Sequence, residues 1–295
     1  MDLSEKVSTP METGVRFVKD GVANGPVSKA VDKPYRELIG SLMYAMTGTR
    51  PDIAFAVVSL SRFNEAPKLA HWRAAKRVLA YLANTVDLGL IFEGNNSISG
   101  FSDADFGGCI ESRKSVSGLL VMSGTAPVIW KSTKQTTVAE STTEAEFVAC
   151  SLFSREIMWV RSFMSELGKP IAGPVTMFVD NKSTINLVQN QQVHSKIKHI
   201  DIKLMAVRQR QDAGAVKLEY ARSENQLADI MTKSLAPKNF FNLRKLLGLM
   251  MLLSLAAIID AISINFKPSD LLQTSPLVKG RLVLKIRSPC VQGVF

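Results

Sequence analysis

The chain has 295 residues, of which 46% are hydrophobic and 21% charged, and its formal net charge is +10 at pH 7. This composition excludes a disordered chain, and the length allows one large core or two modules. The positive charge favours a polyanionic partner, either nucleic acid or an acidic membrane surface, although it can equally serve solubility alone.

Cysteine usage and the N-terminal sequence indicate an intracellular protein of the cytoplasm or nucleus. The three cysteines include no CxxC pair and leave one thiol over, which is typical of a reducing compartment. The opening residues, MDLSEKVSTPMETG, lack the apolar stretch of a secretory signal. Secretion into a host cell is an alternative without positive support, since the chain contains no R-x-L-R tetrapeptide.

Residues 1–33 are expected to be irregular, and residues 34–93 to form a small helical subdomain. Apolar residues repeat at helical spacing over 38–46, over 52–63 and in a segment from about His71. In this third helix the expected buried stripe is Trp72, Ala75, Leu79 and Leu82. Its charged face is either solvated or tracks phosphates, and it comprises Arg73, Lys76 and Arg77, with Lys68 nearby.

After residue 96 the periodicity changes, and an α/β domain is expected over 97–245. The order of elements is β-β-β-α-β-α-α-β-α, which predicts a mixed sheet with helices packed on its faces. The expected strands are 98–103, 118–124, 127–131, 175–179 and 215–221. The expected helices are 142–167, 182–190, 201–212 and a last one from about Glu224.

Residues 246–295 form a divergent C-terminal tail, which does not continue the pattern of strands and helices that precedes it. Its first part, Leu246 to Ile259, is uncharged for 14 residues before Asp260. That length predicts a buried or interfacial apolar helix rather than a membrane span, so stable membrane insertion is not expected. A tilted span that continues through Asp260 is the alternative.

One carboxylate stands at the head of the apolar stripe of the 142–167 helix. Ser141 and Glu144 fit a capping box, which gives Glu144 a structural role. Glu146 instead shares a helical face with Ala149, Cys150, Phe153, Ile157, Val160 and Met164. It is either a functional acid that faces inward or a first-turn glutamate favoured by the helix dipole.

Three further acids stand where an acid has little structural reason to be. Asp103 ends the first strand, Asp180 ends the apolar strand VTMFV, and Asp229 lies on the last expected helix. Carboxylates brought together would repel, and a hard divalent cation such as Mg²⁺ or Mn²⁺ would remove that repulsion. The structural alternatives are turn or cap residues and, for Asp229, an ion pair with Lys233.

The sequence resembles the ribonuclease H domain of copia-type long-terminal-repeat retrotransposon Pol polyproteins, preceded by the end of their reverse transcriptase. The likeness runs from about residue 33 to about residue 249 and implies a ribonuclease H-like mixed five-stranded sheet with flanking helices. The segments that carry it are YRELIGSLMYAMTGTRPDIAFAV, HWRAAKRVLAYLANTVDLGLIF, FSDADFGG, SGLLVMSGTAPVIWKSTKQTTVAESTTEAEFVA, MFVDNKS, HSKIKHIDIK and SENQLADIMTKSL.

By this resemblance the catalytic, metal-binding acids are Asp103, Glu146, Asp180 and Asp229, with Asp105 as the substitute if the strand register differs. The implied reaction is hydrolysis of the RNA strand of an RNA–DNA hybrid with two Mg²⁺ or Mn²⁺ ions. One ion would activate a water and the second, roughly 4 Å away, would stabilise the leaving 3′ oxygen. Recognition would rest on shape, phosphates and the 2′-OH.

The expected substrate-binding residues are Lys131, Lys134, Asn181, His194, Lys196 and Lys198. The loop before Asp229, EYARSENQLAD, lacks the histidine of many cellular ribonucleases H. No Asp-Asp pair occurs in the chain, so no polymerase activity is expected, and integrase and protease signatures are absent. The alternative to an active nuclease is a catalytically silent or repurposed remnant, acting as a nucleic-acid-binding module, an interaction protein or a secreted effector.

Overall fold

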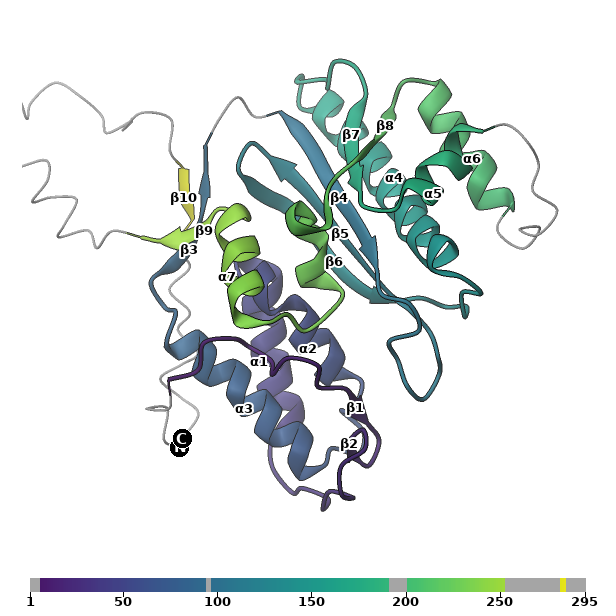
Figure 1. Cartoon of the computed structure of the whole chain (residues 1–295). Coiled ribbons are helices and arrows are strands. Elements are labelled where there is room, and N and C mark those ends of the chain that lie inside the picture. The colour runs from purple at the N-terminus through teal and green to yellow at the C-terminus, as the bar shows by residue number, and fades with distance from the viewer. Residues whose placement is uncertain (1–5, 94–96, 191–200, 253–281, 285–295) are drawn as a thin grey trace, which may run out of the picture.

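The computed structural model describes residues 6–93, 97–190, 201–252 and 282–284, and a five-stranded sheet stands at its centre (Figure 1). Its strands, in the spatial order β6-β5-β4-β7-β8, make β4 the central one. β4 pairs antiparallel with β5 and parallel with β7, so the carboxyl ends of β4 and β7 meet at one edge. The strands are β4 Ile98–Ala104, β5 Val116–Ser123, β6 Ala126–Lys134, β7 Val175–Val179 and β8 Val216–Tyr220.

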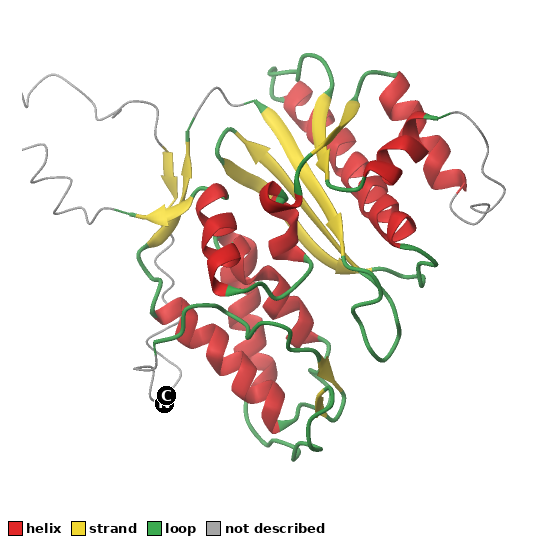
Figure 2. Cartoon of the chain, viewed as in Figure 1, coloured by secondary structure: helices red, strands yellow, loops and turns green. Residues whose placement is uncertain are grey.

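Three helices cover one side of this sheet, as Figure 2 shows. They are α4 Thr142–Glu166, α5 Lys182–Gln189 and α6 Asp201–Asp212. α4 buries the expected stripe except Met164, which is half-buried, and Phe153 packs so close to β4 that a Cβ on Gly100 would lie 2.3 Å from its ring. The mixed sheet, the strand order and these helices confirm the predicted ribonuclease H-like α/β fold.

A second group of helices covers the other side of the sheet. It comprises α1 Tyr35–Gly48, η1 Pro51–Ile53, α2 Ala54–Ser61, α3 Leu69–Ala83, η3 Ser223–Asn225, η4 Leu227–Met231 and α7 Pro237–Leu246. Leu120 and Met122 of β5 share a hydrophobic core with α1, α2 and α3. The indole N–H of Trp130 donates to the carbonyl of Met46 at 2.9 Å. The predicted helical subdomain therefore packs directly on the sheet.

Two small sheets complete the described structure. β1 Phe17–Val18 and β2 Gly21–Val22 form a short hairpin in the otherwise irregular N-terminal segment. β3 Leu88–Phe92 pairs antiparallel with β9 Leu249–Met251 and with β10 Leu282–Leu284. The sequence analysis did not predict these strands.

Two predictions about the last part of the chain are wrong. Instead of one helix from about Glu224, the chain forms the 3₁₀ turns η3 and η4, and α7 begins only at Pro237. The predicted apolar helix over 246–259 does not form in its described first part, where Leu249–Met251 is a strand, and residues 253–259 lie outside the described residues. No helix among the described residues has both the length and the apolar character that a bilayer crossing demands.

A buried ion pair joins the helices of the second group. The Arg50 guanidinium donates to both carboxylate oxygens of Asp52, at 2.9 Å each, and to the carbonyl of Thr85 at 3.0 Å. The Tyr81 hydroxyl donates to Asp52 Oδ2 at 2.6 Å, and Arg244 of α7 donates to the Tyr81 oxygen. Both charged side chains are at least nine-tenths buried, so each depends on the other.

Candidate metal centre

Three acids from three elements converge at the carboxyl edge of the sheet. Asp103 is the second-last residue of β4, Asp180 directly follows β7, and Glu146 lies in the first turns of α4. One carboxylate oxygen from each lies within 4.8 Å of the others. Asp103 and Glu146 are buried and Asp180 is half-buried, so the cluster has limited access to water.

The start of α4 explains why Glu146 and not Glu144 enters this cluster. Ser141 caps the helix by accepting from the Glu144 N–H at 3.2 Å, and the Glu144 carboxylate turns back to accept from the Glu140 N–H. The Gln135 side chain donates to the Ala145 carbonyl at 2.9 Å, which fixes the first turn against the sheet. Glu146 then projects inward beneath the buried stripe, as predicted.

The negative charges of these acids repel one another. Burial, followed by the charges of Asp103 and Asp180, raises the pKa of Glu146 to about 10. Burial and the charge of Asp103 also raise the pKa of Asp180, although a hydrogen bond from Ser223 opposes this. Glu146 Oε2 is buried and has no hydrogen-bond partner among the described residues.

This donor set fits a hard divalent cation. Such a cation takes oxygen ligands, and all three converging groups are carboxylates. It would give Glu146 Oε2 the partner that it lacks and would reverse the repulsion that raises the pKa of Glu146. The three carboxylates would therefore be stabilised by a bound metal ion, whereas without one their charges repel.

The fourth predicted acid, Asp229, lies on η4 and is held differently. Its Oδ1 is 2.8 Å from the Lys233 ammonium, which is also 4.0 Å from Asp103 Oδ2. Burial and the charge of Asp103 raise its pKa to about 7, while the charge of Lys233 lowers it. The ion pair that was its structural alternative is therefore present, and Asp229 is not one of the three converging acids.

Residues 223–233, here called the 223–233 segment, hold the acids in place. Ser223 donates to Asp180 Oδ2 at 3.0 Å, and the Thr232 hydroxyl donates to Asp103 Oδ2. Gln226, completely buried, donates to the carbonyl of Ser102 on β4 at 3.1 Å. These contacts place the segment across the edge where the acids meet.

Gly118 of β5 lets η4 approach the sheet. A Cβ at this position would lie 2.7 Å from Met231 Cβ and 2.7 Å from Thr232 Cγ2, closer than side-chain atoms pack. The missing side chain thus allows Thr232 to reach Asp103.

The sequence analysis missed Ser223, Gln226 and Thr232. All three lie within SENQLADIMTKSL, one of the segments that carry the resemblance. That placement was the available signal, because hydroxyl and amide side chains in a polar loop have no pattern of their own. Their partners are distant in sequence and become visible only in the fold.

Asp105 and Lys131 do not belong to the three-acid cluster. Asp105 accepts from the Val116 N–H and so belongs to its own loop, which leaves Asp103 as the acid of the cluster. Lys131 pairs with Glu156 at 2.7 Å, and Glu156 is ten residues beyond Glu146, roughly 15 Å along α4.

Of the remaining predicted substrate-binding residues, Lys134 is exposed at the end of β6. Asn181 caps α5 by accepting from the Thr184 N–H at 3.1 Å. His194, Lys196 and Lys198 lie outside the described residues.

The pKa shifts give a first prediction, for the metal-free protein. Raised pKa values of about 7 for Asp229 and about 10 for Glu146 mean that the folded state binds more protons than the unfolded state above about pH 4. The stability that these groups contribute is therefore complete below their unfolded-state pKa values and is lost as pH rises through the folded-state values. Denaturant midpoints in EDTA should fall from pH 5 to pH 9, and Mg²⁺ should reduce the fall. A midpoint in EDTA that rises over this range would contradict the cluster as described.

Comparison with known proteins places the chain among transposon proteins. It is 38% identical over 248 residues to a retrovirus-related Pol polyprotein from transposon TNT 1-94 of Nicotiana tabacum, covering 83% of this chain but 18% of that protein. It is 46% identical over 129 residues to the secreted RxLR effector protein 161 of Plasmopara viticola, covering 43% of this chain and 91% of that protein. The chain thus spans less than a fifth of the length of the Pol polyprotein.

Comparison with protein-family models finds no match. Among solved structures, LC11-RNase H1 in complex with an RNA/DNA hybrid is 12% identical, with a TM-score of 0.35. That similarity covers 46% of this chain and 94% of that structure.

Proposed function

Because the chain belongs to the family of copia-type retrovirus-related Pol polyproteins from transposons, we propose that it is a metal-dependent ribonuclease that hydrolyses the RNA strand of RNA–DNA hybrids. The observation that carries this proposal is the convergence of Asp103, Glu146 and Asp180 within 4.8 Å. The similarity to transposon Pol polyproteins supports ribonuclease H-type function in a transposon, and to this we add specificity for hybrids and dependence on metal.

The three acids would hold one divalent ion, Mg²⁺ or Mn²⁺, and Asp229 with Asp103 would hold a second. Bound there, such ions activate a water and neutralise the leaving oxygen of a phosphodiester. The protein's own contribution is to fix the carboxylates in a buried, preorganised site, which requires no nucleophilic side chain. Ser223 and Thr232 are positioning residues, since each orients one of the acids through a hydrogen bond.

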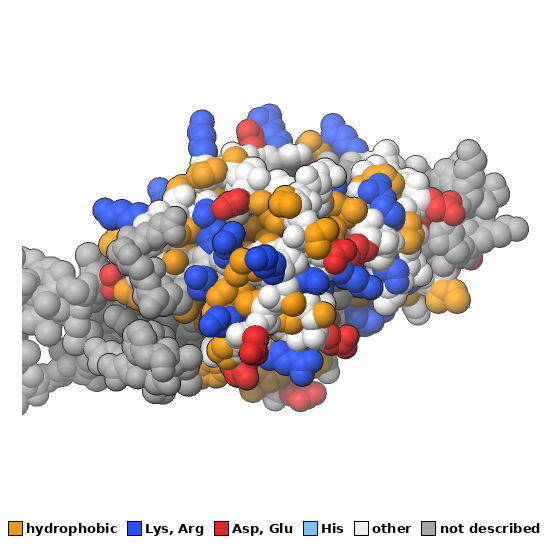
Figure 3. Space-filling model, turned by 90° about the horizontal axis from the view of Figure 1, so that it is seen from below, with side chains coloured by type: hydrophobic (Ala, Val, Ile, Leu, Met, Phe, Trp, Pro, Cys, Tyr) orange, Lys and Arg blue, Asp and Glu red, His pale blue; other side chains and the backbone are white. Residues whose placement is uncertain are grey.

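The proposed substrate fits the charge of the chain. A net charge of +10 suits a polyanion, and phosphate contacts supply most of the affinity in sequence-independent binding. On the face shown in Figure 3, Lys and Arg side chains are interspersed with Asp, Glu and hydrophobic ones rather than gathered in one patch. Recognition by overall shape and scattered phosphate contacts is consistent with that surface, and Lys134 remains a proposed contact.

The substrate class is tested with four end-labelled substrates of one sequence: RNA–DNA hybrid, duplex RNA, duplex DNA and single-stranded RNA. The proposal expects cleavage of the RNA strand of the hybrid alone, with Mg²⁺ or Mn²⁺ and not in EDTA. Equal cleavage of single-stranded RNA would contradict hybrid specificity.

A second prediction concerns Thr232, replaced by valine of nearly the same shape. The variant loses the hydrogen bond that orients Asp103, and a hydrogen bond to a charged group contributes about 1.5–3 kcal/mol, or about a 10- to 100-fold fall in kcat. Thr184→Val is the matched control, because it removes a fully buried hydroxyl whose partner is the Thr143 carbonyl. Equal rates for the two variants would show that Thr232 has no positioning role.

A second candidate function is an acid-independent role as a nucleic-acid-binding or interaction protein. The observation in its favour is the similarity over 91% of the length of a secreted effector. Such a role uses the fold and surface and does not require the acids, whereas here one carboxylate oxygen from each of the three acids lies within 4.8 Å of the others. Binding or biological activity that survives loss of all three acids would favour this candidate. Finding where the protein acts would then decide between an intracellular and a secreted role.

A further inference from the structure

Among the described side chains, that of Lys233 brings a positive charge close to two of the acids, Asp229 and Asp103. Its ammonium lies 2.8 Å from Asp229 Oδ1 and 4.0 Å from Asp103 Oδ2. It thus stands between the acid on η4 and the acid at the end of β4. Of the three converging acids, Asp103 lies near this ammonium, at the longer distance of 4.0 Å.

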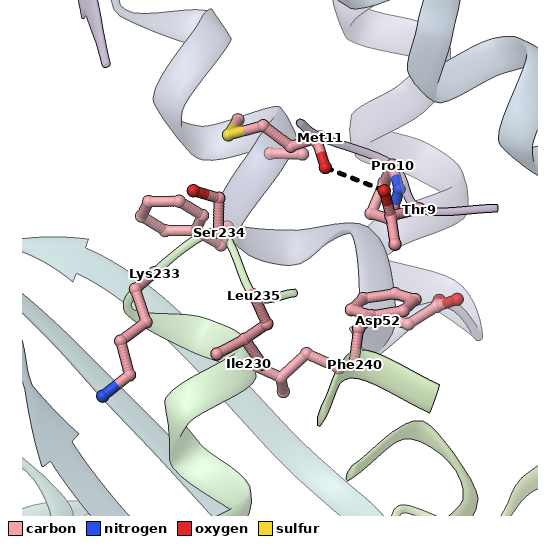
Figure 4. A pocket seen from close by; sticks show the side chains of 11 residues that line it. Thr9, Pro10, Met11, Asp52, Ile230, Lys233, Ser234, Leu235 and Phe240 are labelled. Carbon is pink, nitrogen blue, oxygen red and sulfur yellow. Dashed lines mark hydrogen bonds between the residues drawn. The ribbon is translucent and has the colours of Figure 1, made fainter. Parts of the chain in front are cut away.

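The backbone around Lys233 is firmly held, whereas its side chain has room to move. The residues that follow it are bound to the N-terminal segment, since Ser234 Oγ accepts from the Gly14 N–H and the Leu235 carbonyl accepts from the Thr13 hydroxyl. Figure 4 shows the Lys233 ammonium pointing away from the other labelled residues around a small cavity. The side chain is 46% exposed, so the ammonium can leave the acids without unfolding the segment.

The ammonium and a metal ion would compete for Asp229. An ion bound to Asp229 Oδ1 would lie about 2.1 Å from that oxygen, in the region that the ammonium occupies at 2.8 Å. Two cations that close repel strongly in a partly buried site. An ion can therefore bind Asp229 only when the ammonium withdraws, whereas an ion among Asp103, Glu146 and Asp180 faces the ammonium only at the longer distance of 4.0 Å from Asp103.

We propose that Lys233 is a positioning residue that takes the place of a metal ion beside Asp229 in the metal-free protein and so sets the order of metal binding. This inference rests on the proposed function and extends it. The ion held by Asp103, Glu146 and Asp180 binds first, and the ion at Asp229 binds second and more weakly, in exchange for the lysine.

The experiment measures Mn²⁺ binding to the full chain in the absence of nucleic acid. Binding is followed by the decrease in the electron paramagnetic resonance signal of free Mn²⁺. The variants are Lys233→Met, which removes the charge, and Lys233→Arg, which keeps it. Lys217→Met is the control, because it removes the same charge from an exposed pair with Glu219 on β8. The proposal expects the dissociation constant of the weaker ion to fall at least about tenfold in Lys233→Met and to stay near the wild-type value in Lys233→Arg and Lys217→Met.

The outcomes separate the two proposals. Unchanged affinity of the weaker ion in Lys233→Met, with the stronger ion still bound, would overturn the role of Lys233 and leave the metal centre standing. Detection of one ion alone in both wild type and Lys233→Met would also overturn it. Failure of the folded wild type to bind any Mn²⁺ would overturn the metal centre itself. Thermal unfolding in EDTA checks that each variant is folded.

Discussion

Replacing Asp103 by asparagine is expected to lower hybrid cleavage by at least about 10³-fold, since metal-binding acids act as a unit and the loss of one disables the others. Asp103 is the acid whose charge acts on Glu146, Asp180 and Asp229 together. Removing it also relieves repulsion, so the metal-free variant should be at least as stable as the wild type. The two readouts are the cleavage rate in Mg²⁺ and the denaturant midpoint in EDTA.

Asp105→Asn is the matched control for that variant. Asp105 lies two residues along the same strand end, but its carboxylate accepts from the Val116 N–H, and an asparagine oxygen can accept the same bond. Near wild-type cleavage by Asp105→Asn and near-complete loss in Asp103→Asn would establish which acid belongs to the site. The reverse result would show that the strand register places the wrong acid at the centre.

Replacing Asp52 by asparagine is expected to lower the free energy of unfolding by about 3–5 kcal/mol, because breaking a buried ion pair leaves an uncompensated charge. The variant leaves the Arg50 guanidinium, 8% exposed, without its counter-charge and weakens the bond from Tyr81. Since Arg244 of α7 bonds to Tyr81, the loss should spread to the packing of α7 on the helical subdomain. Denaturant unfolding of the full chain measures it.

Asp20→Asn is the comparison for the buried pair. Asp20 lies 4.0 Å from Lys68, its side chain is 70% exposed, and such surface pairs contribute about 0–1 kcal/mol. If Asp52→Asn unfolds at nearly the same denaturant concentration as Asp20→Asn, the Arg50–Asp52 pair is not what joins the helices.

The sequence predicted the central sheet and α4 because their patterns are local. Short, largely apolar runs between turn residues marked the strands, and the Ser141 cap with the apolar stripe marked α4 from end to end. The inward position of Glu146 followed from counting along that helical face. Asp103 and Asp180 followed from their places at the ends of strands, where the loops of α/β folds form sites.

The errors arise where distant contacts decide the structure. Leu227 to Met231 has helical spacing, yet the buried Gln226 side chain bonds to β4 and the segment forms the 3₁₀ turn η4 instead. Strands β3 and β9 are short apolar runs that pair across more than 150 residues, and such runs do not distinguish a strand from a helix. In α3 the structure buries His71, with Val18 and Gly21 carbonyls as partners, and leaves Trp72 only half-buried.

Asp103, Glu146 and Asp180 are proposed to form a metal-dependent centre that hydrolyses RNA in an RNA–DNA hybrid. The most direct measurement compares cleavage of an end-labelled RNA–DNA hybrid by the wild type and by Asp180→Asn, each in Mg²⁺, in Mn²⁺ and in EDTA. The wild type is expected to cut the RNA strand in either metal and not in EDTA, and Asp180→Asn is expected to cut in none of the three conditions. A folded wild type that cuts in neither metal, or an Asp180→Asn variant that cuts as fast as the wild type, would contradict it.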